Sequence, residues 1–105
     1  MAPRRRVRSL FDVAIDLDAR QATRQDQDLG LTSHEFNLLA CLVERPGRAF
    51  TRDQLAEQAL PEGGERTART VDSHISRIRK KLGAPAGSAI QTVWGIGYRL
   101  QMEEH

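Results

Sequence analysis

The side chains best suited to recognising another molecule lie between residues 67 and 82, in a segment whose spacing predicts a helix. At about 100° per residue, one side of that helix carries three cations and two hydroxyls: Arg69, Arg77, Lys80, Ser73 and Ser76. The opposite side is a narrow aliphatic stripe: Val71, Ile75, Ile78 and Leu82. Guanidinium and ammonium groups bind phosphates and base edges, and hydroxyls donate and accept hydrogen bonds. The pattern favours a helix that packs by its stripe and enters a DNA major groove, which is wide enough to admit one.

The distribution of charge agrees with a surface that faces a polyanion. The net charge is only +2, but residues 69–81 hold five basic side chains against the single acid Asp72, a balance of +4. Four more arginines lie between residues 4 and 8, and the acids gather in 12–28, in 53–65 and at the tail. Such a split into basic and acidic zones is typical of nucleic-acid binding. Charge alone leaves a solvated basic helix as the alternative.

Composition limits the class of protein. A chain of 105 residues is long enough for one domain and too short for two with separate cores. No apolar run approaches the roughly 20 residues of a membrane span, and the N-terminus lacks the apolar segment of a signal peptide. The single cysteine, Cys41, excludes an internal disulfide and fits a reducing compartment. We expect a cytoplasmic protein without contact to a membrane.

Enzymatic chemistry has little support in the sequence. The three histidines and the cysteine lack the spacing of metal ligands, and no glycine-rich phosphate loop is present. Cys41 and His34 lie two helical turns apart and are the one nucleophile–base couple that spacing allows. Nothing nearby would orient His34, so we expect no enzyme, no cofactor and no metal.

Three helices and flanking strands are predicted around this segment. Strand-like pieces cover 7–11, 13–17, 20–24 and 28–31. Capping boxes start two helices, Thr32 with Glu35 and Thr51 with Gln54, and the third helix runs from Thr67 as N-cap to Gly83. Two final strands, 90–93 and 98–100, are joined by a turn with two glycines.

The order of these elements predicts the fold class. A small sheet, three helices and a hairpin make an α+β fold, a winged helix-turn-helix with an N-terminal antiparallel sheet and a C-terminal hairpin as the wing. We expect the domain over 8–101, after a disordered basic arm (1–7) and before a short tail (102–105).

Four motifs, in order, resemble one family. They are Leu31-Thr32-x-x-Glu35-Phe36-x-Leu38-Leu39, Thr51-Arg52-x-x-Leu55, Arg69-Thr70-Val71-Asp72-x-His74-Ile75-x-x-Ile78-Arg79-x-Lys81-Leu82, and Ile90-x-Thr92-Val93-x-Gly95-x-Gly97-Tyr98-Arg99. Together they resemble the OmpR/PhoB-type winged-helix effector domain of bacterial two-component response regulators, over about residues 8–101. Around His74-Ile75-Ser76 the sequence is most similar to the CpxR-like branch.

The resemblance implies a function and partners. Members regulate transcription by binding double-stranded DNA, often in head-to-tail pairs on tandem half-sites, and usually carry an N-terminal receiver domain phosphorylated on an aspartate. The third helix (67–82) would read the major groove, while the hairpin (90–100) would contact the adjacent minor groove or backbone. The loop at 59–66 corresponds to a surface that often contacts RNA polymerase in the family. The alternative is a winged helix used for protein or RNA contacts.

Residue roles follow from the outward face and the resemblance. For the major groove we expect Arg69, Ser73, Ser76, Arg77 and Lys80, with Arg77 as the guanine reader. For the DNA backbone we expect Arg52, His74, Thr92 and Tyr98. His74 could equally be a packed boundary residue, and Tyr98 could be half-buried. Arg79 lies beside Asp72, which predicts an intramolecular ion pair. Trp94 replaces the arginine that the family often aims into the minor groove, and an indole can pack there on sugars or phosphates.

Overall fold

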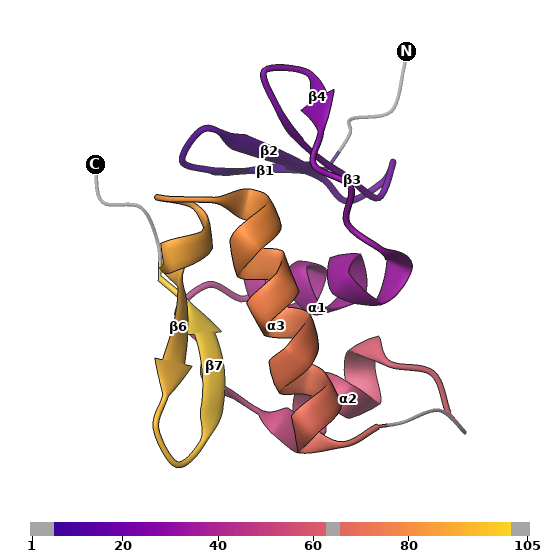
Figure 1. The fold of residues 1–105 in the computed structure, drawn as a ribbon, viewed down its shortest axis with the longest axis vertical. Helices are drawn as coiled ribbons and strands as arrows, with labels where there is room; N and C mark the ends of the chain where they lie inside the picture. Colours follow the sequence, from indigo (N-terminus) through magenta and orange to yellow (C-terminus); the bar gives the residue numbers. More distant parts are fainter. Residues whose placement is uncertain (1–5, 63–65, 102–105) are drawn as a thin grey trace.

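The computed structural model describes residues 6–62 and 66–101. Over these residues the chain forms a winged helix-turn-helix: an antiparallel four-stranded sheet, a bundle of three helices and a three-stranded sheet that includes the C-terminal hairpin. In Figure 1 the N-terminal sheet lies above the helices, and the hairpin lies beside α3 with its turn at the opposite end. The predicted fold class is confirmed.

The N-terminal sheet is a meander of short strands. Its strands are β1 (Val7–Leu10), β2 (Val13–Asp16), β3 (Gln21–Arg24) and β4 (Gln27–Asp28), paired in that order. Two sequence predictions are wrong here. The fourth strand ends at Asp28, whereas we expected it over 28–31. Residues 6 and 7 belong to the fold and not to the arm, because Val7 pairs with Asp16 and the carbonyl of Arg6 accepts from the amide of Leu17. Residues 1–5 and 102–105, the rest of the expected arm and the tail, lie outside the described part.

The helices begin at the capping residues that the sequence predicted. Helix α1 (Ser33–Glu44) has Thr32 as N-cap, α2 (Arg52–Ala59) has Thr51, and α3 (Ala68–Leu82) has Thr67. The first two caps are complete capping boxes, because the side-chain oxygens of Glu35 and Gln54 accept from the backbone amide of the cap residue. The N-termini of all three helices are therefore determined by local sequence.

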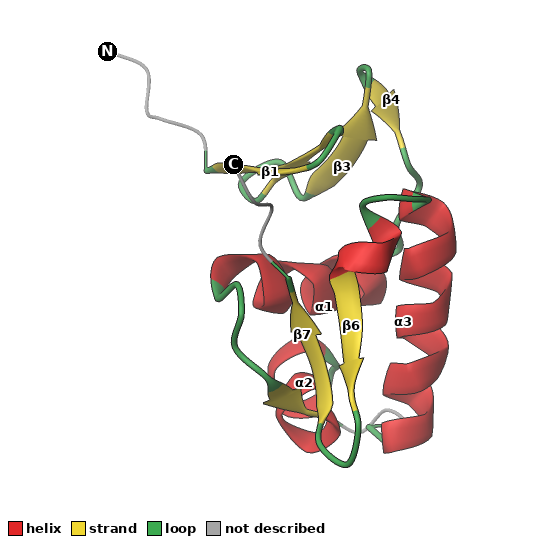
Figure 2. Cartoon of the chain, turned by 90° about the vertical axis from the view of Figure 1, so that its left-hand side faces the viewer, coloured by secondary structure: helices red, strands yellow, loops and turns green. Residues whose placement is uncertain are grey.

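The wing is attached to the start of α2. The short helix η1 (Gly87–Ala89) leads into β6 (Ile90–Val93), and β7 (Gly97–Leu100) returns antiparallel to it. A two-residue strand that we did not predict, β5 (Phe50–Thr51), pairs with the other edge of β7. Figure 2 shows this three-stranded sheet beside α3. Gly97 is required by that pairing, because a Cβ atom there would lie 2.1 Å from the Phe50 carbonyl oxygen.

One apolar core joins all of these elements. The stripe of α3 is fully buried in it: Val71, Ile75, Ile78 and Leu82 are each 0% exposed. The same cluster includes Ile15 from the N-terminal sheet, Leu38 from α1, Leu55 from α2 and Ile90 from the wing. The opposite face of α3 is consequently directed outward. Among the described residues, no helix combines the length and apolar character needed to cross a bilayer.

Candidate nucleic-acid interface

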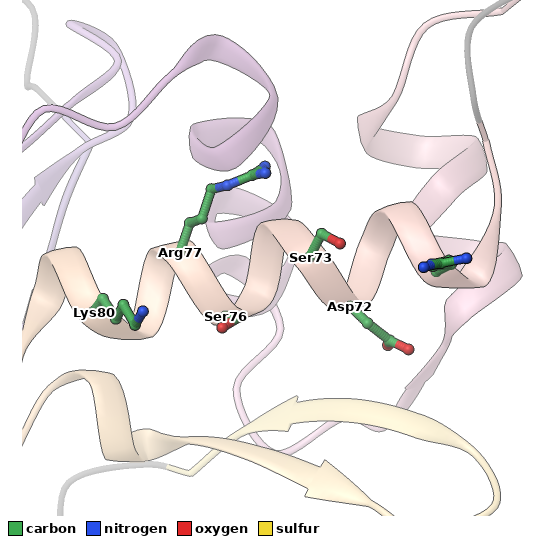
Figure 3. A pocket seen from close by; sticks show the side chains of 6 residues that line it. Asp72, Ser73, Ser76, Arg77 and Lys80 are labelled. Carbon is green, nitrogen blue, oxygen red and sulfur yellow. The ribbon is translucent and has the colours of Figure 1, made fainter.

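The outward face of α3 presents the side chains that the sequence singled out. Arg69, Ser73, Ser76, Arg77 and Lys80 are all exposed, and together with Asp72 they line one open hollow. In Figure 3, Arg77 and Ser73 leave the helix on one side, whereas Asp72 leaves it on the side of the hairpin. The aliphatic stripe anchors the helix from behind, so these side chains form a row along its outward face, which we call the ridge. The one acid among the residues that line the hollow is Asp72, on the side of the wing.

Asp72 connects this ridge to two neighbouring elements. Its Oδ1 atom accepts from Arg52 Nε at 2.8 Å and from the Tyr98 hydroxyl at 2.6 Å. The Arg52 guanidinium also lies 6.0 Å from the centre of the Tyr98 ring. Residues of α2, α3 and β7 therefore meet at one carboxylate oxygen.

The ion pair that we predicted between Arg79 and Asp72 is wrong. Arg79 turns to the wing, where its Nη2 atom donates to the Ile90 carbonyl at 2.7 Å and to the Thr92 hydroxyl oxygen at 3.1 Å. Its guanidinium lies 5.4 Å from the Tyr98 ring centre. A backbone carbonyl at the start of β6 and an aromatic face offer Arg79 partners that helical spacing cannot reveal.

Three of the expected backbone-contacting residues have partners within the protein. Arg52 retains about two fifths of its side-chain exposure (40%) despite its bond to Asp72. Tyr98 is buried (5% exposed), and burial, followed by its hydrogen bond to Asp72, raises the pKa of its hydroxyl. Thr92 is half-buried and accepts from Arg79, which leaves its own hydroxyl proton free to donate.

His74 lies at the edge of the ridge, between α3 and α1. It is half-buried, its ring meets the His34 ring edge-on at 5.9 Å, and its buried Nδ1 atom has no hydrogen-bond partner within the described structure. Burial, and then the charge of Arg77, lower the pKa of His74. The imidazole is therefore held toward its neutral form, which suits a packed position as well as a neutral hydrogen bond.

The turn of the wing is apolar and open to solvent. Trp94 is 89% exposed and Ile96 is 49% exposed. An indole exposed to this degree makes almost no contact within the described fold, so it is available to a partner that lies against the end of the wing.

Behind the ridge, an ion pair that the sequence did not reveal joins α1 to α3. Lys81 Nζ donates to Glu35 Oε1 at 2.6 Å and to the carbonyl of Gly30 at 2.9 Å. Glu35 is only 1% exposed and also accepts from the Thr32 amide at 2.9 Å. The i to i+3 capping pattern identified Glu35 as a cap, but its long-range partner requires the fold.

Cys41 and His34, the couple considered in the sequence, have no interaction with each other within the described part of the chain. Burial raises the pKa of the half-buried Cys41 thiol, and the charge of Glu44 raises it further, which keeps the thiol protonated. The His34 ring contacts the His74 ring and not the Cys41 thiol. Over residues 6–62 and 66–101 there is no group of three or more histidine, cysteine or acidic side chains able to hold a metal ion.

Fold and ridge together define a winged-helix domain whose third helix is exposed beside its wing. The chain belongs to the family described as "Transcriptional regulatory protein, C terminal", the OmpR/PhoB-type winged-helix domain, whose model matches residues 26–100.

Similar proteins are transcriptional regulators and their DNA-binding domains. The transcriptional regulatory protein SrrA of Staphylococcus aureus is 36% identical over 94 residues, 87% of this chain and 39% of SrrA. The chain thus spans about two fifths of the length of that relative. The DNA-binding domain of response regulator AdeR, solved with an intercistronic region, is 33% identical with a TM-score of 0.71, covering 86% of this chain and 93% of its own. The DNA-binding domain of Klebsiella pneumoniae RstA, solved with the RstA box, is 30% identical with a TM-score of 0.74, covering 91% of this chain and 97% of its own. The E. coli CpxR domain is 26% identical with a TM-score of 0.78, covering 91% and 96%.

Proposed function

We propose that this chain is the sequence-specific, double-stranded DNA-binding domain of a bacterial two-component response regulator, and that it regulates transcription. The observation that carries the proposal is the exposed ridge of cations and hydroxyls on α3, held beside the wing by an aliphatic stripe that is fully buried. The similarity to the AdeR and RstA domains, both solved with DNA, supports it. The family does not itself exclude an enzymatic activity, but the protonated Cys41 thiol gives catalysis no support.

In this proposal α3 enters the major groove. Arg77 is exposed at the centre of the ridge and can bind a guanine through two parallel hydrogen bonds, worth about 1–3 kcal/mol in discrimination. Arg69 and Lys80 flank it along the helix and add charge, and each also reaches base edges. Ser73 and Ser76 are too short to read two base atoms at once, so they contribute close or water-mediated contacts.

The backbone contacts surround this groove. Arg52, at the first position of α2, contacts a phosphate with help from the amides at that helix N-terminus. His74 and Thr92 donate to phosphates on either side of α3. Tyr98 serves the backbone contacts indirectly, because its buried hydroxyl donates its proton to Asp72, the residue that also holds Arg52. Trp94 packs against the sugars at the minor groove.

The partners and location that we propose are those typical of the family, which supports them. The receiver domain precedes this domain in the full-length protein, which acts in the bacterial cytoplasm at the nucleoid. Two copies bind tandem half-sites head to tail. The loop over 59–66 contacts RNA polymerase; residues 63–65 lie outside the described structure, while Arg66 holds the start of the loop by donating to the Leu60 carbonyl at 2.8 Å.

Selection of bound duplexes from a random library, followed by salt titration, tests the proposal. A binder that neutralises several phosphates loses affinity linearly in log salt. Arg77→Ala should weaken the selected site far more than random DNA, whereas Arg52→Ala should weaken both about equally. A flat salt response would instead favour a winged helix used for protein contacts. Equal losses on both DNAs for Arg77→Ala would remove this residue from base reading.

A further inference from the structure

Asp72 is an acid placed at the edge of a surface that is otherwise cationic. Its side chain is 41% exposed and lines the same hollow as Arg69, Ser73, Ser76, Arg77 and Lys80. A carboxylate at this position repels the phosphates of an approaching duplex and lowers the net charge of the ridge. On electrostatics alone, DNA binding would improve if this acid were absent, so its presence requires a compensating contribution.

The contacts of Asp72 provide that contribution. One oxygen, Oδ1, accepts from Arg52 Nε at 2.8 Å and from the Tyr98 hydroxyl at 2.6 Å, so donors from α2 and β7 are fixed relative to α3 by a single acceptor. Hydrogen bonds to an ionised acceptor are about twice as strong as neutral ones. The carboxylate is also neutralised locally by the Arg52 guanidinium.

We propose that Asp72 is a positioning residue for DNA binding: its Oδ1 atom holds the Arg52 guanidinium and the Tyr98 hydroxyl, and thereby sets a phosphate-binding arginine and the wing at fixed places beside the reading face of α3. The proposal rests on the DNA-binding function proposed above. It deepens that function by assigning a role to the one acid of the ridge.

The two donors control different parts of the interface. Arg52 is the first residue of α2 and keeps 40% of its side-chain exposure while its Nε atom is bound, so the guanidinium is oriented and still accessible to a phosphate. Tyr98 is on β7, which pairs with β6 at Thr92 and leads back to the turn that carries Trp94. Holding Tyr98 therefore holds the wing strand at the height of the second turn of α3.

This arrangement predicts that removal of the acid Asp72 weakens DNA binding, although charge alone would predict tighter binding. Asp72→Ala makes the ridge more positive, yet it releases both Arg52 and Tyr98. The affinity for the selected duplex should therefore fall by about tenfold. The slope of log affinity against log salt should decrease by the amount expected for about one lost phosphate contact. Asp53→Asn is the matched control, because Asp53 is an exposed acid in the same first turn as Arg52. Its affinity should equal or exceed that of the unmodified protein.

Two further variants separate geometry from charge. Asp72→Asn removes the charge and keeps an oxygen that accepts both donors, so it should restore binding to within about threefold of the unmodified protein or better. Tyr98→Phe releases only the wing. The fluorescence of Trp94, the single tryptophan of the chain and 89% exposed, reports contact of the wing with DNA. Tyr98→Phe should therefore reduce the change in Trp94 emission on DNA addition while leaving the salt slope unchanged.

The experiment measures affinity, salt slope and Trp94 emission for all four variants, after circular dichroism has shown that each is folded. If Asp72→Ala binds as tightly as the unmodified protein, or more tightly, or if Asp72→Asn is as weak as Asp72→Ala, the positioning role is overturned. If Asp72→Ala does not fold, Tyr98→Phe decides: an unchanged Trp94 response overturns the proposal. Failure of the unmodified protein to bind any selected duplex overturns the DNA-binding function instead.

Discussion

Replacing Lys81 by methionine tests how strongly the ion pair behind the ridge stabilises the fold. The change keeps the unbranched apolar stem and removes the ammonium that donates to Glu35 at 2.6 Å and to the Gly30 carbonyl. The partner carboxylate is 1% exposed, so Lys81→Met leaves a buried charge whose remaining hydrogen-bond donor in the described structure is the Thr32 amide, at 2.9 Å.

The expected magnitude follows from burial. Removing one partner of a fully buried ion pair costs about 3–5 kcal/mol. Lys81 keeps 32% of its side-chain exposure, so water screens its ammonium, and we expect about 2–3 kcal/mol of unfolding free energy to be lost at pH 7. For a domain of this size that loss corresponds to a fall in Tm of roughly 10–15 °C.

The dependence on pH has a defined sign. Burial raises the pKa of Glu35. The hydrogen bonds from Lys81 and Thr32 together lower it by a larger amount, so the pKa of Glu35 lies below its ordinary value. A carboxyl whose pKa is lowered by folding stabilises the fold above its unfolded pKa of about 4.3, and the contribution is lost as the pH falls through the folded value. The difference in unfolding free energy between the unmodified protein and Lys81→Met should therefore become smaller at acidic pH, where Glu35 is protonated in both.

Chemical denaturation of Lys81→Met, Glu35→Gln and the double variant at pH 7 measures the coupling. Glutamine preserves the capping box, so Glu35→Gln removes the charge and not the cap. We expect a coupling free energy of about 1.5–2 kcal/mol. A loss for Lys81→Met below about 0.5 kcal/mol, or an equal loss in the Glu35→Gln background, would refute the reasoning.

Three other outcomes are expected. Arg79→Ala should lower the unfolding free energy by about 1–3 kcal/mol, because the Ile90 carbonyl loses its donors, and a denaturant titration that shows no loss contradicts this. Gly97→Ala should cost more than about 3 kcal/mol or displace the wing, since its Cβ atom would lie 2.1 Å from the Phe50 carbonyl; a variant with unchanged Tm would exclude the pairing of β5 with β7. The pKa of His74 is lower in the folded than in the unfolded chain, so the unfolded chain is protonated at a higher pH. The unfolding free energy should therefore fall as the pH drops below about 6.5. His74→Gln should remove that part of the pH dependence between pH 7 and pH 5, and an identical profile would show that another group causes it.

Features set by neighbours in the sequence were predictable. The capping threonines mark the helix starts because the hydrogen bonds they make span three residues. The stripe of α3 identified its buried face because a helix that is aliphatic on one side has one way to pack. The same regularity placed the five outward residues of the ridge in the open.

Features that depend on distant partners were not predictable. Asp72 and Arg79 lie two turns apart on the same side of α3. Asp72 instead bonds to Arg52 and Tyr98, which are 20 and 26 residues away, and Arg79 bonds to the wing. The strand β5 has only two residues, too few for an alternating pattern, and exists because β7 offers it an edge. Spacing along a helix indicates which side chains of that helix can pair with one another. It gives no information on partners from other elements, which depend on the tertiary fold.

The N-terminal sheet also sets a lower limit on how far the domain can be shortened. Arg24 on β3 is bonded to Asp12 at 2.7 Å and donates to the carbonyl of Leu82, the last residue of α3. The Gly30 carbonyl, just after β4, receives Lys81. A fragment starting at Thr32 would keep every helix and the wing, yet it would strip the C-terminal end of α3 of both attachments. The Lys81–Glu35 ion pair would then be the one polar contact of the three that still holds this end of α3. The sheet thus helps to fix the orientation of the helix that faces DNA, although it lies at the opposite end of the molecule from the turn of the wing.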